Sequence, residues 1–119
     1  MAQVLALVDD LFFQAKILET AKQLRITVRT STTGDALLAE IAKEVPQLVI
    51  VDLNARGAPV QAIERVRAIA PGLPLIAFLS HVQTDLAQQA RAAGCTQVMP
   101  RSQFTRDLAT ILADRKSVV

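Results

Sequence analysis

The residues most able to do chemistry in this chain are three aspartates that follow short apolar runs. Asp9 and Asp10 stand side by side after the first run, and Asp52 ends a later one. Carboxylates that converge on one crevice raise each other's pKa values unless a cation neutralises them. Mg²⁺ suits such a site because it prefers oxygen ligands in octahedral geometry. We therefore expect a Mg²⁺ site in which Asp10 and Asp52 coordinate the ion directly, Asp9 through a water and Asn54 through its main-chain carbonyl.

Asp52 gives this site a candidate reaction. A carboxylate that attacks a phosphoryl donor becomes an aspartyl phosphate, and a bound cation offsets the charge that develops. For any one of the three acids taken singly, a helix cap is the more common role, and Asp10 can accept backbone N–H bonds at the start of the helix that contains Phe13. For the three acids together, at the ends of two strands, we favour the metal site.

Two further apolar runs also end in polar residues. Ser80 and His81 follow the run 75–79, and Arg101 follows the run 97–99 and Pro100. Ligands of open α/β sheets bind beyond the carboxyl ends of the strands, where the strand order reverses. These residues are therefore candidates for the same site. His81 is the only histidine and Ser80 lacks the strained turn of a nucleophilic serine, so we expect His81 to be a loop residue rather than a catalytic one.

The apolar runs that position these residues alternate with segments of helical spacing. Most runs are near-continuous, as in strands covered on both faces of a parallel sheet, and one alternates, as in an edge strand. Strands are expected over 3–8, 25–30, 48–51, 75–79 and 97–99. Five repeats of strand and helix predict an α/β fold, a three-layer doubly wound parallel sheet of five strands with five helices.

Apolar residues three and four positions apart indicate where the helices lie. The expected helical segments are 12–24, 37–45 beginning near Thr33, 63–70 after Pro59, 86–93 capped by Gly94, and 108–112 with Ser102 as the N-cap. Phe12 and Phe13 directly follow the acid pair. We expect both to seat the first helix on the sheet, the alternative being that one of them lies near the mouth of the crevice.

Composition indicates one small domain over residues 1–119. A chain of this length with 51% hydrophobic residues can bury a core without disulfides or metal staples. Cys95 is the only cysteine, which excludes an internal disulfide, and we expect it to be a small buried apolar residue. No signal segment is visible and no apolar run is long enough to span a bilayer, which favours the cytoplasm.

The charge pattern argues against direct nucleic-acid binding. Thirteen Lys and Arg are interleaved with eleven Asp and Glu to a net charge of +2, with no run of like charge, and four Phe are the only aromatic residues. No glycine-rich phosphate loop is present, which counts against nucleotide binding.

Four segments, VLALVDD, LVIVDLN, LPLIAFLS and ARAAGCTQVMPR, carry a resemblance that covers nearly the whole chain. With these segments the chain resembles the receiver domains of bacterial response regulators. The resemblance implies a flavodoxin-like sheet of strand order 2-1-3-4-5 and a Mg²⁺ ion at the acid pair. It also implies phosphorylation of Asp52 by a sensor histidine kinase or a phosphotransfer protein in two-component signalling. Enzyme activity would be limited to self-phosphorylation from a donor and autodephosphorylation, and the fourth and fifth helices would contact an effector or a second copy.

The chain departs from the receiver pattern at the residues that would contact phosphate. Counted without gaps, the hydroxyl residue that ends the fourth strand falls on Leu79, and Ser80 comes one place later unless a bulge shifts the register. The family's lysine after the fifth strand falls on Arg101, which keeps the charge but has a different geometry. Alternatively, Arg101 forms an ion pair with Asp52 or Asp10 that substitutes for the metal.

Arg56, in the loop after Asp52, could also neutralise the acids, although an exposed loop arginine is the more common case. The sequence thus favours an atypical receiver that accepts a phosphoryl group on Asp52 with the help of Mg²⁺, with Ser80 and Arg101 as phosphate contacts and an altered switch. The alternative is a phosphorylation-independent pseudo-receiver that acts as a protein-interaction module.

Overall fold

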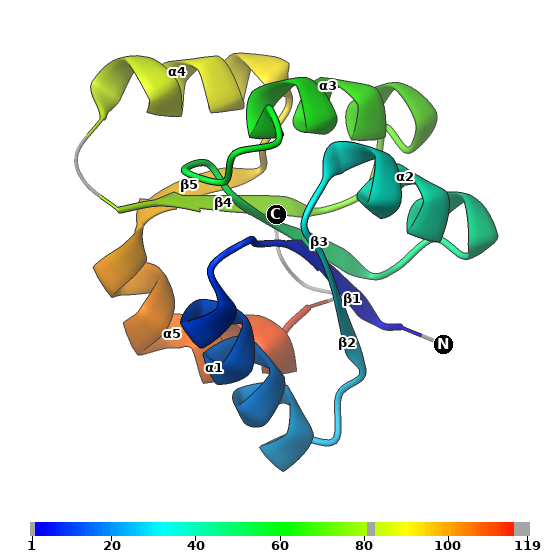
Figure 1. The fold of residues 1–119 in the computed structure, drawn as a ribbon, viewed down its shortest axis with the longest axis vertical. Helices are drawn as coiled ribbons and strands as arrows, with labels where there is room; N and C mark the ends of the chain where they lie inside the picture. Colours follow the sequence, from blue (N-terminus) through cyan, green and yellow to red (C-terminus); the bar gives the residue numbers. More distant parts are fainter. Residues whose placement is uncertain (1, 81–82, 116–119) are drawn as a thin grey trace.

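The computed structural model describes residues 2–80 and 83–115, in which strands and helices alternate as expected (Figure 1). The elements are β1 (Val4–Leu7), α1 (Leu11–Gln23), β2 (Val28–Ser31), α2 (Gly34–Lys43), β3 (Leu48–Asp52), α3 (Pro59–Ile69), β4 (Leu75–Leu79), α4 (Thr84–Ala93), β5 (Gln97–Pro100) and α5 (Arg101–Ala113). No helix in these two stretches of chain has the length and apolar character needed to cross a membrane.

The strands form one parallel sheet in the order β2-β1-β3-β4-β5, which confirms the expected topology. Leu7 at the end of β1 pairs with both Ser31 of β2 and Val51 of β3. The carboxyl ends of β1 and β3 lie side by side because the two strands are parallel neighbours, and the strand order reverses between them. The residues that follow β1 are thereby placed next to Asp52, the last residue of β3.

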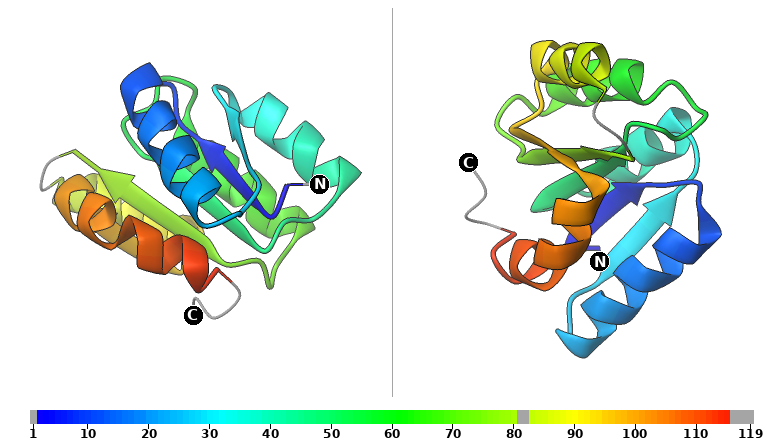
Figure 2. Two further views of the ribbon diagram at one scale, coloured as in Figure 1. Left: turned by 90° about the horizontal axis from the view of Figure 1, so that it is seen from below. Right: turned by 90° about the vertical axis from the view of Figure 1, so that its left-hand side faces the viewer.

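Helices cover both faces of the sheet, as Figures 1 and 2 show. On one face, α1 and α5 pack on the strand residues Val4, Ala6, Ile50, Ile76 and Phe78. On the other face, α2, α3 and α4 pack on the alternate strand residues Leu5, Leu7, Val49, Val51, Leu75 and Ala77. Burial on both faces explains why β1, β3 and β4 are apolar at almost every position.

Most of the helices begin at an N-cap side chain or at a proline in the first turn. The side-chain oxygen of Thr33 accepts a hydrogen bond from the Ala36 N–H at 3.1 Å, and Pro59 occupies the first position of α3. The N-cap predicted at Ser102 is wrong, because α5 begins at Arg101 directly after Pro100, and Ser102 lies inside its first turn. The edge strand also begins later than expected, because Arg25 adopts a positive φ of 58° in the turn that precedes it.

Candidate functional site

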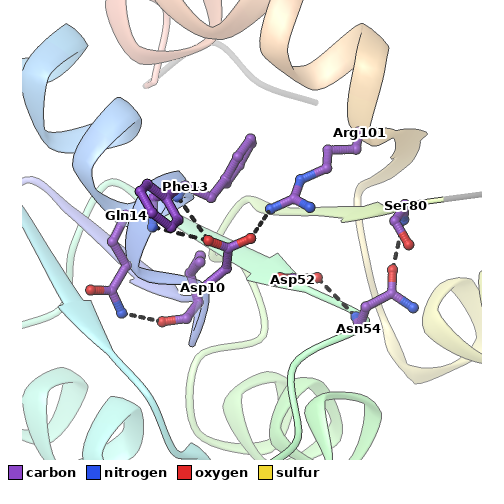
Figure 3. A network of polar contacts seen from close by, with 9 residues as sticks. Asp10, Phe13, Gln14, Asp52, Asn54, Ser80 and Arg101 are labelled. Carbon is purple, nitrogen blue, oxygen red and sulfur yellow. Dashed lines mark hydrogen bonds and ion pairs between the residues drawn. The ribbon is translucent and has the colours of Figure 1, made fainter.

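Asp10 has both carboxylate oxygens engaged (Figure 3). Oδ1 accepts hydrogen bonds from the backbone N–H groups of Phe12 at 3.0 Å and Phe13 at 3.1 Å, which is the N-cap that the sequence offered as an alternative. Oδ2 lies 2.9 Å from Nη2 of Arg101. The pKa of Asp10 is lowered, first by the hydrogen bond from Phe13 and then by the one from Arg101. Asp10 is therefore held as an anion between α1 and α5.

Arg101 is the first residue of α5, and its side chain extends across the carboxyl end of the sheet to reach Asp10. Its guanidinium carbon lies 4.1 Å from the ring centroid of Phe13 and 5.9 Å from that of Phe78. Within the described part of the chain, the buried Nε atom of Arg101 has no hydrogen-bond partner. The ion pair with Asp10 that the sequence left open is thus present, and two aromatic rings support it.

Asp52 is buried at the end of β3, with 5% of its surface exposed. Its Oδ1 atom accepts a hydrogen bond from the Asn54 N–H at 2.9 Å. Burial raises the pKa of Asp52, whereas the hydrogen bond from Asn54 and the charge of Arg101 act in the opposite direction. Asp9 and Asp10 raise the pKa further through charge repulsion. The three acids are therefore near enough to interact electrostatically.

Asp9 is held by the loop after β3. Its Oδ2 atom accepts a hydrogen bond from the backbone N–H of Arg56 at 2.9 Å, and the Arg56 Nε atom lies 3.7 Å away. The Arg56 side chain is 96% exposed. Arg56 therefore stabilises Asp9 mainly through its main chain, and its guanidinium is largely solvated, as expected of a loop arginine.

The expected Mg²⁺ ligand set at the three aspartates stays a prediction. Each carboxylate faces a different partner: a main-chain N–H for Asp9 and for Asp52, and the α1 terminus and Arg101 for Asp10. Across residues 2–80 and 83–115, no three His, Cys, Asp or Glu side chains are grouped so as to hold a metal ion. The donor set does not fit Mg²⁺ while Arg101 lies on Asp10, because a guanidinium already takes the oxygen that a metal would need.

Asn54 and Ser80 form a polar bridge that the sequence did not reveal. The Ser80 N–H donates to Oδ1 of Asn54 at 2.6 Å, and Nδ2 of Asn54 donates to Oε1 of Gln83 at 2.9 Å. No residue pattern predicts this bridge, because it depends on where the fold places Asn54 relative to Ser80 and Gln83. It joins the residue expected to supply a carbonyl ligand to the residue expected to contact phosphate.

The strand register leaves Ser80 outside the sheet. β4 pairs with β5 without interruption up to Leu79, which lies opposite Pro100. The described register thus contains no bulge that would bring Ser80 one place back, and Leu79 fills the position with a buried side chain. Ser80 is exposed just beyond the strand. His81 lies outside the described residues.

Phe12 and Phe13 have opposite environments, so the expectation that both seat α1 on the sheet is wrong. The Phe13 ring is buried with its centroid 4.9 Å from that of Phe78, whereas Phe12 is 90% exposed. Neighbouring helix positions point about 100° apart, so only one of the two rings can face the sheet. Leu11 is also exposed, and together Leu11 and Phe12 form an apolar tip next to Asp10.

The sequence predicts that Cys95 is a buried apolar residue, and the structure confirms this only in part. It is half-buried beside the cluster under α3 and α4, and burial raises its pKa to about 12. The thiol is therefore almost entirely protonated at neutral pH and is a poor nucleophile.

Comparisons with known proteins show what this fold is similar to. No protein-family model matches the chain. Among curated proteins, the transcriptional activator protein ExaE of Pseudomonas putida is 31% identical over 70 residues, which is 58% of this chain. The chain covers 33% of that relative's length.

Solved structures match over almost the whole chain. The CheY-like response regulator receiver domain protein of Methanospirillum hungatei JF-1 has a TM-score of 0.86 at 17% identity, covering 98% of this chain and 94% of that one. CheY4 of Vibrio cholerae has a TM-score of 0.85 at 21% identity, covering 100% and 99%. In the longer NtrX chain of Brucella abortus, with a TM-score of 0.83 at 19% identity, the match covers 98% of this chain and 26% of that one. The chain thus has the flavodoxin-like fold of these receiver domains.

Proposed function

We propose that this chain, whose fold is that of response-regulator receiver domains, is an atypical receiver that accepts a phosphoryl group on Asp52. The observation that carries the proposal is the place of Asp52, buried at the carboxyl end of β3 and beside the reversal of strand order. The Asn54 N–H orients one carboxylate oxygen, and the site is partly desolvated. Both features suit a carboxylate nucleophile.

The transfer would take the phosphoryl group from a phosphohistidine of a sensor kinase or a phosphotransfer protein. An oxygen of Asp52 forms the new bond to phosphorus while the bond from phosphorus to the donor's imidazole breaks. The imidazole leaves with the electron pair and takes a proton from solvent. We place the donor's contact at the exposed tip of Leu11 and Phe12, which borders the site.

Arg101 is the proposed switch residue. Its guanidinium is paired with Asp10 before phosphorylation, and its charge already acts on Asp52. A phosphoryl group on Asp52 is a stronger and bidentate acceptor for a guanidinium than a single carboxylate oxygen. We expect Arg101 to turn from Asp10 toward the new phosphate, with Ser80 as a second contact.

The phosphorylation-independent interaction module is the second candidate, and one observation favours it. The Asp10–Arg101 ion pair neutralises part of the acid charge from within the chain. A site whose acid charge is partly neutralised by the chain's own arginine can remain unphosphorylated and present a constant surface to a partner.

The proposed function also implies a surface through which the chain contacts an effector or a second copy. We place the effector or second-copy surface on α4 and α5, and a cavity of about 220 Å³ between α4 and β5 offers it a recess. The cavity is lined by Leu79, Gln83, Thr84, Ala87, Arg91, Val98, Met99 and Pro100. We propose a cytoplasmic location, no direct nucleic-acid contact and no enzyme activity beyond self-phosphorylation and autodephosphorylation.

Intact-mass measurement after incubation with acetyl phosphate tests the reaction. The wild type should gain one phosphoryl group in a base-labile linkage, and Asp52→Asn should gain none. Asp107→Asn removes a carboxylate from α5 and is the matched control, which should behave as the wild type. Absence of the adduct from the wild type, with phosphoramidate as well as acetyl phosphate, would favour the interaction module.

A further inference from the structure

We infer that the guanidinium of Arg101 competes with divalent metal ions for Asp10, and so sets how tightly the acid site of Asp9, Asp10 and Asp52 binds metal. The inference does not depend on phosphorylation of Asp52. It concerns the acid site before any reaction and holds for either candidate function.

The first support is the use of the Asp10 oxygens. Oδ1 caps α1 through two N–H groups, and Oδ2 faces Nη2 of Arg101 at 2.9 Å. A divalent ion coordinates carboxylate oxygens at about 2.0–2.1 Å for Mg²⁺. An ion at that distance from Oδ2 would lie within a few ångströms of the guanidinium, where the two positive charges repel each other. Asp10 can therefore bind either the Arg101 guanidinium or a divalent metal ion through Oδ2, but not both at the same time.

The second support is the way in which Arg101 is held. As the first residue of α5, it has a fixed backbone, and its side chain is 31% exposed. The guanidinium lies over the Phe13 ring at 4.1 Å, an arrangement that favours the cation beyond its pairing with Asp10. Arg56 is the contrast, because its side chain is 96% exposed beside Asp9. Arg101 is thus positioned in advance at Asp10, whereas Arg56 is mostly solvated.

The consequence is quantitative. The apparent dissociation constant of a ligand equals its intrinsic constant divided by the fraction of molecules able to bind it. If Arg101 occupies Asp10 in about nine molecules of ten, metal binding is weakened about tenfold. Removing the guanidinium should therefore strengthen metal binding about tenfold.

Mn²⁺ binding, followed by the loss of the free-ion signal in electron paramagnetic resonance, measures this competition. Arg101→Met removes the charge and keeps an apolar chain of similar length against Phe13. We expect it to bind Mn²⁺ about tenfold more tightly than the wild type. Adding Asp10→Asn to Arg101→Met should abolish the gain. Arg106→Met, on the same helix and with the same change in net charge, is the control and should stay within about twofold of the wild type.

Two results would overturn the inference. One is equal Mn²⁺ affinity in the wild type and Arg101→Met, whether binding is tight or undetectable. The other is an equal gain in Arg106→Met, which would make the effect one of net charge alone. Arg101→Ala provides a second variant, and circular dichroism checks that each variant is folded. Because no phosphoryl donor is present, failure here is distinguishable from failure of the proposed phosphorylation.

Discussion

Two aspartates at neighbouring strand ends have opposite electrostatic environments. Asp10 accepts hydrogen bonds from α1 and from Arg101, and its pKa is lowered. Asp52 is buried with one hydrogen bond from Asn54, and its pKa is raised. Placement of the side chain rather than residue type thus separates a structural anion from a candidate nucleophile.

The raised pKa of Asp52 predicts the effect of Asp52→Asn on stability. Because the folded-state pKa lies above the unfolded-state value, ionised Asp52 lowers the free energy of unfolding at neutral pH. Below the unfolded-state pKa the residue is protonated in both states, and this cost vanishes. Asp52→Asn should therefore melt at a higher temperature than the wild type at pH 7, and the difference should shrink as the pH falls through the folded-state pKa toward about 4.

Thermal melts followed by circular dichroism between pH 7 and pH 4 provide this measurement. Asp107→Asn controls for the loss of one negative charge. A lower melting temperature of Asp52→Asn at pH 7, or a difference that does not change with pH, would contradict the assigned effect of burial.

At the scale of elements, one arginine of α3 hydrogen-bonds to the segments that precede β4 and β5. These contacts lie near the amino ends of the strands, whereas the acids lie at the carboxyl ends. The Arg67 guanidinium, from the last turn of α3, donates to the carbonyls of Ala70, Pro71 and Leu73 before β4. It also donates twice to the carbonyl of Gly94 between α4 and β5. Gly94 has a φ of 122°, and a Cβ atom there would lie 2.9 Å from Arg67, so both conformation and space require glycine.

Loss of this arginine should destabilise the fold more than loss of an exposed arginine on the same helix. Arg67→Met leaves partly buried carbonyls without donors and should lower the free energy of unfolding by about 1–3 kcal/mol. Arg65→Met removes only the exposed ion pair with Asp35 and should cost less than about 1 kcal/mol. Urea unfolding followed by circular dichroism measures both values. Equal losses in the two variants would show that the Arg67 hydrogen bonds contribute little.

Element boundaries were predictable where apolar residues decide them. The apolar run 75–79 coincides with both ends of β4, because burial on both faces requires an unbroken apolar run. The start of α5 lies before the segment that its apolar spacing predicts, because Phe104 is the only large apolar residue in its first two turns. The edge strand β2 begins after the residue that the alternating pattern predicts, because nothing in the residue types reveals the positive φ of Arg25.

The candidate site was predictable in its location and less so in its contacts. The strand-end rule brought Asp10 and Asp52 together, since it depends only on topology. Whether Arg101 faced a metal, a phosphate or Asp10 could not be decided, because 91 residues separate the partners and α5 packing directs the side chain. Similarly, only the rotation of α1 determines that Phe13, and not Phe12, lies under the guanidinium.

For the whole molecule, the sheet couples the two helical layers. Alternate residues of β1, β3 and β4 belong to the cluster under α1 and α5 or to the cluster under α2, α3 and α4. If the helices on one face of the sheet unfold, the strands lose half of their packing, and the helices on the other face then lose the surface on which they pack. The two layers are therefore expected to unfold as a single cooperative unit.

Truncations in opposite layers test this cooperativity. Leu37 of α2 and Leu112 of α5 are both fully buried, and Leu37→Ala or Leu112→Ala should each lower the free energy of unfolding by about 2–5 kcal/mol. Leu11→Ala, at a position that is 74% exposed, is the control and should cost less than about 0.5 kcal/mol. In urea titrations followed by methyl NMR signals from both layers, the two layers should lose structure at the same midpoint in every variant. A variant in which the layer carrying the truncation unfolds first would show instead that the sheet does not transmit the loss of packing from one layer to the other.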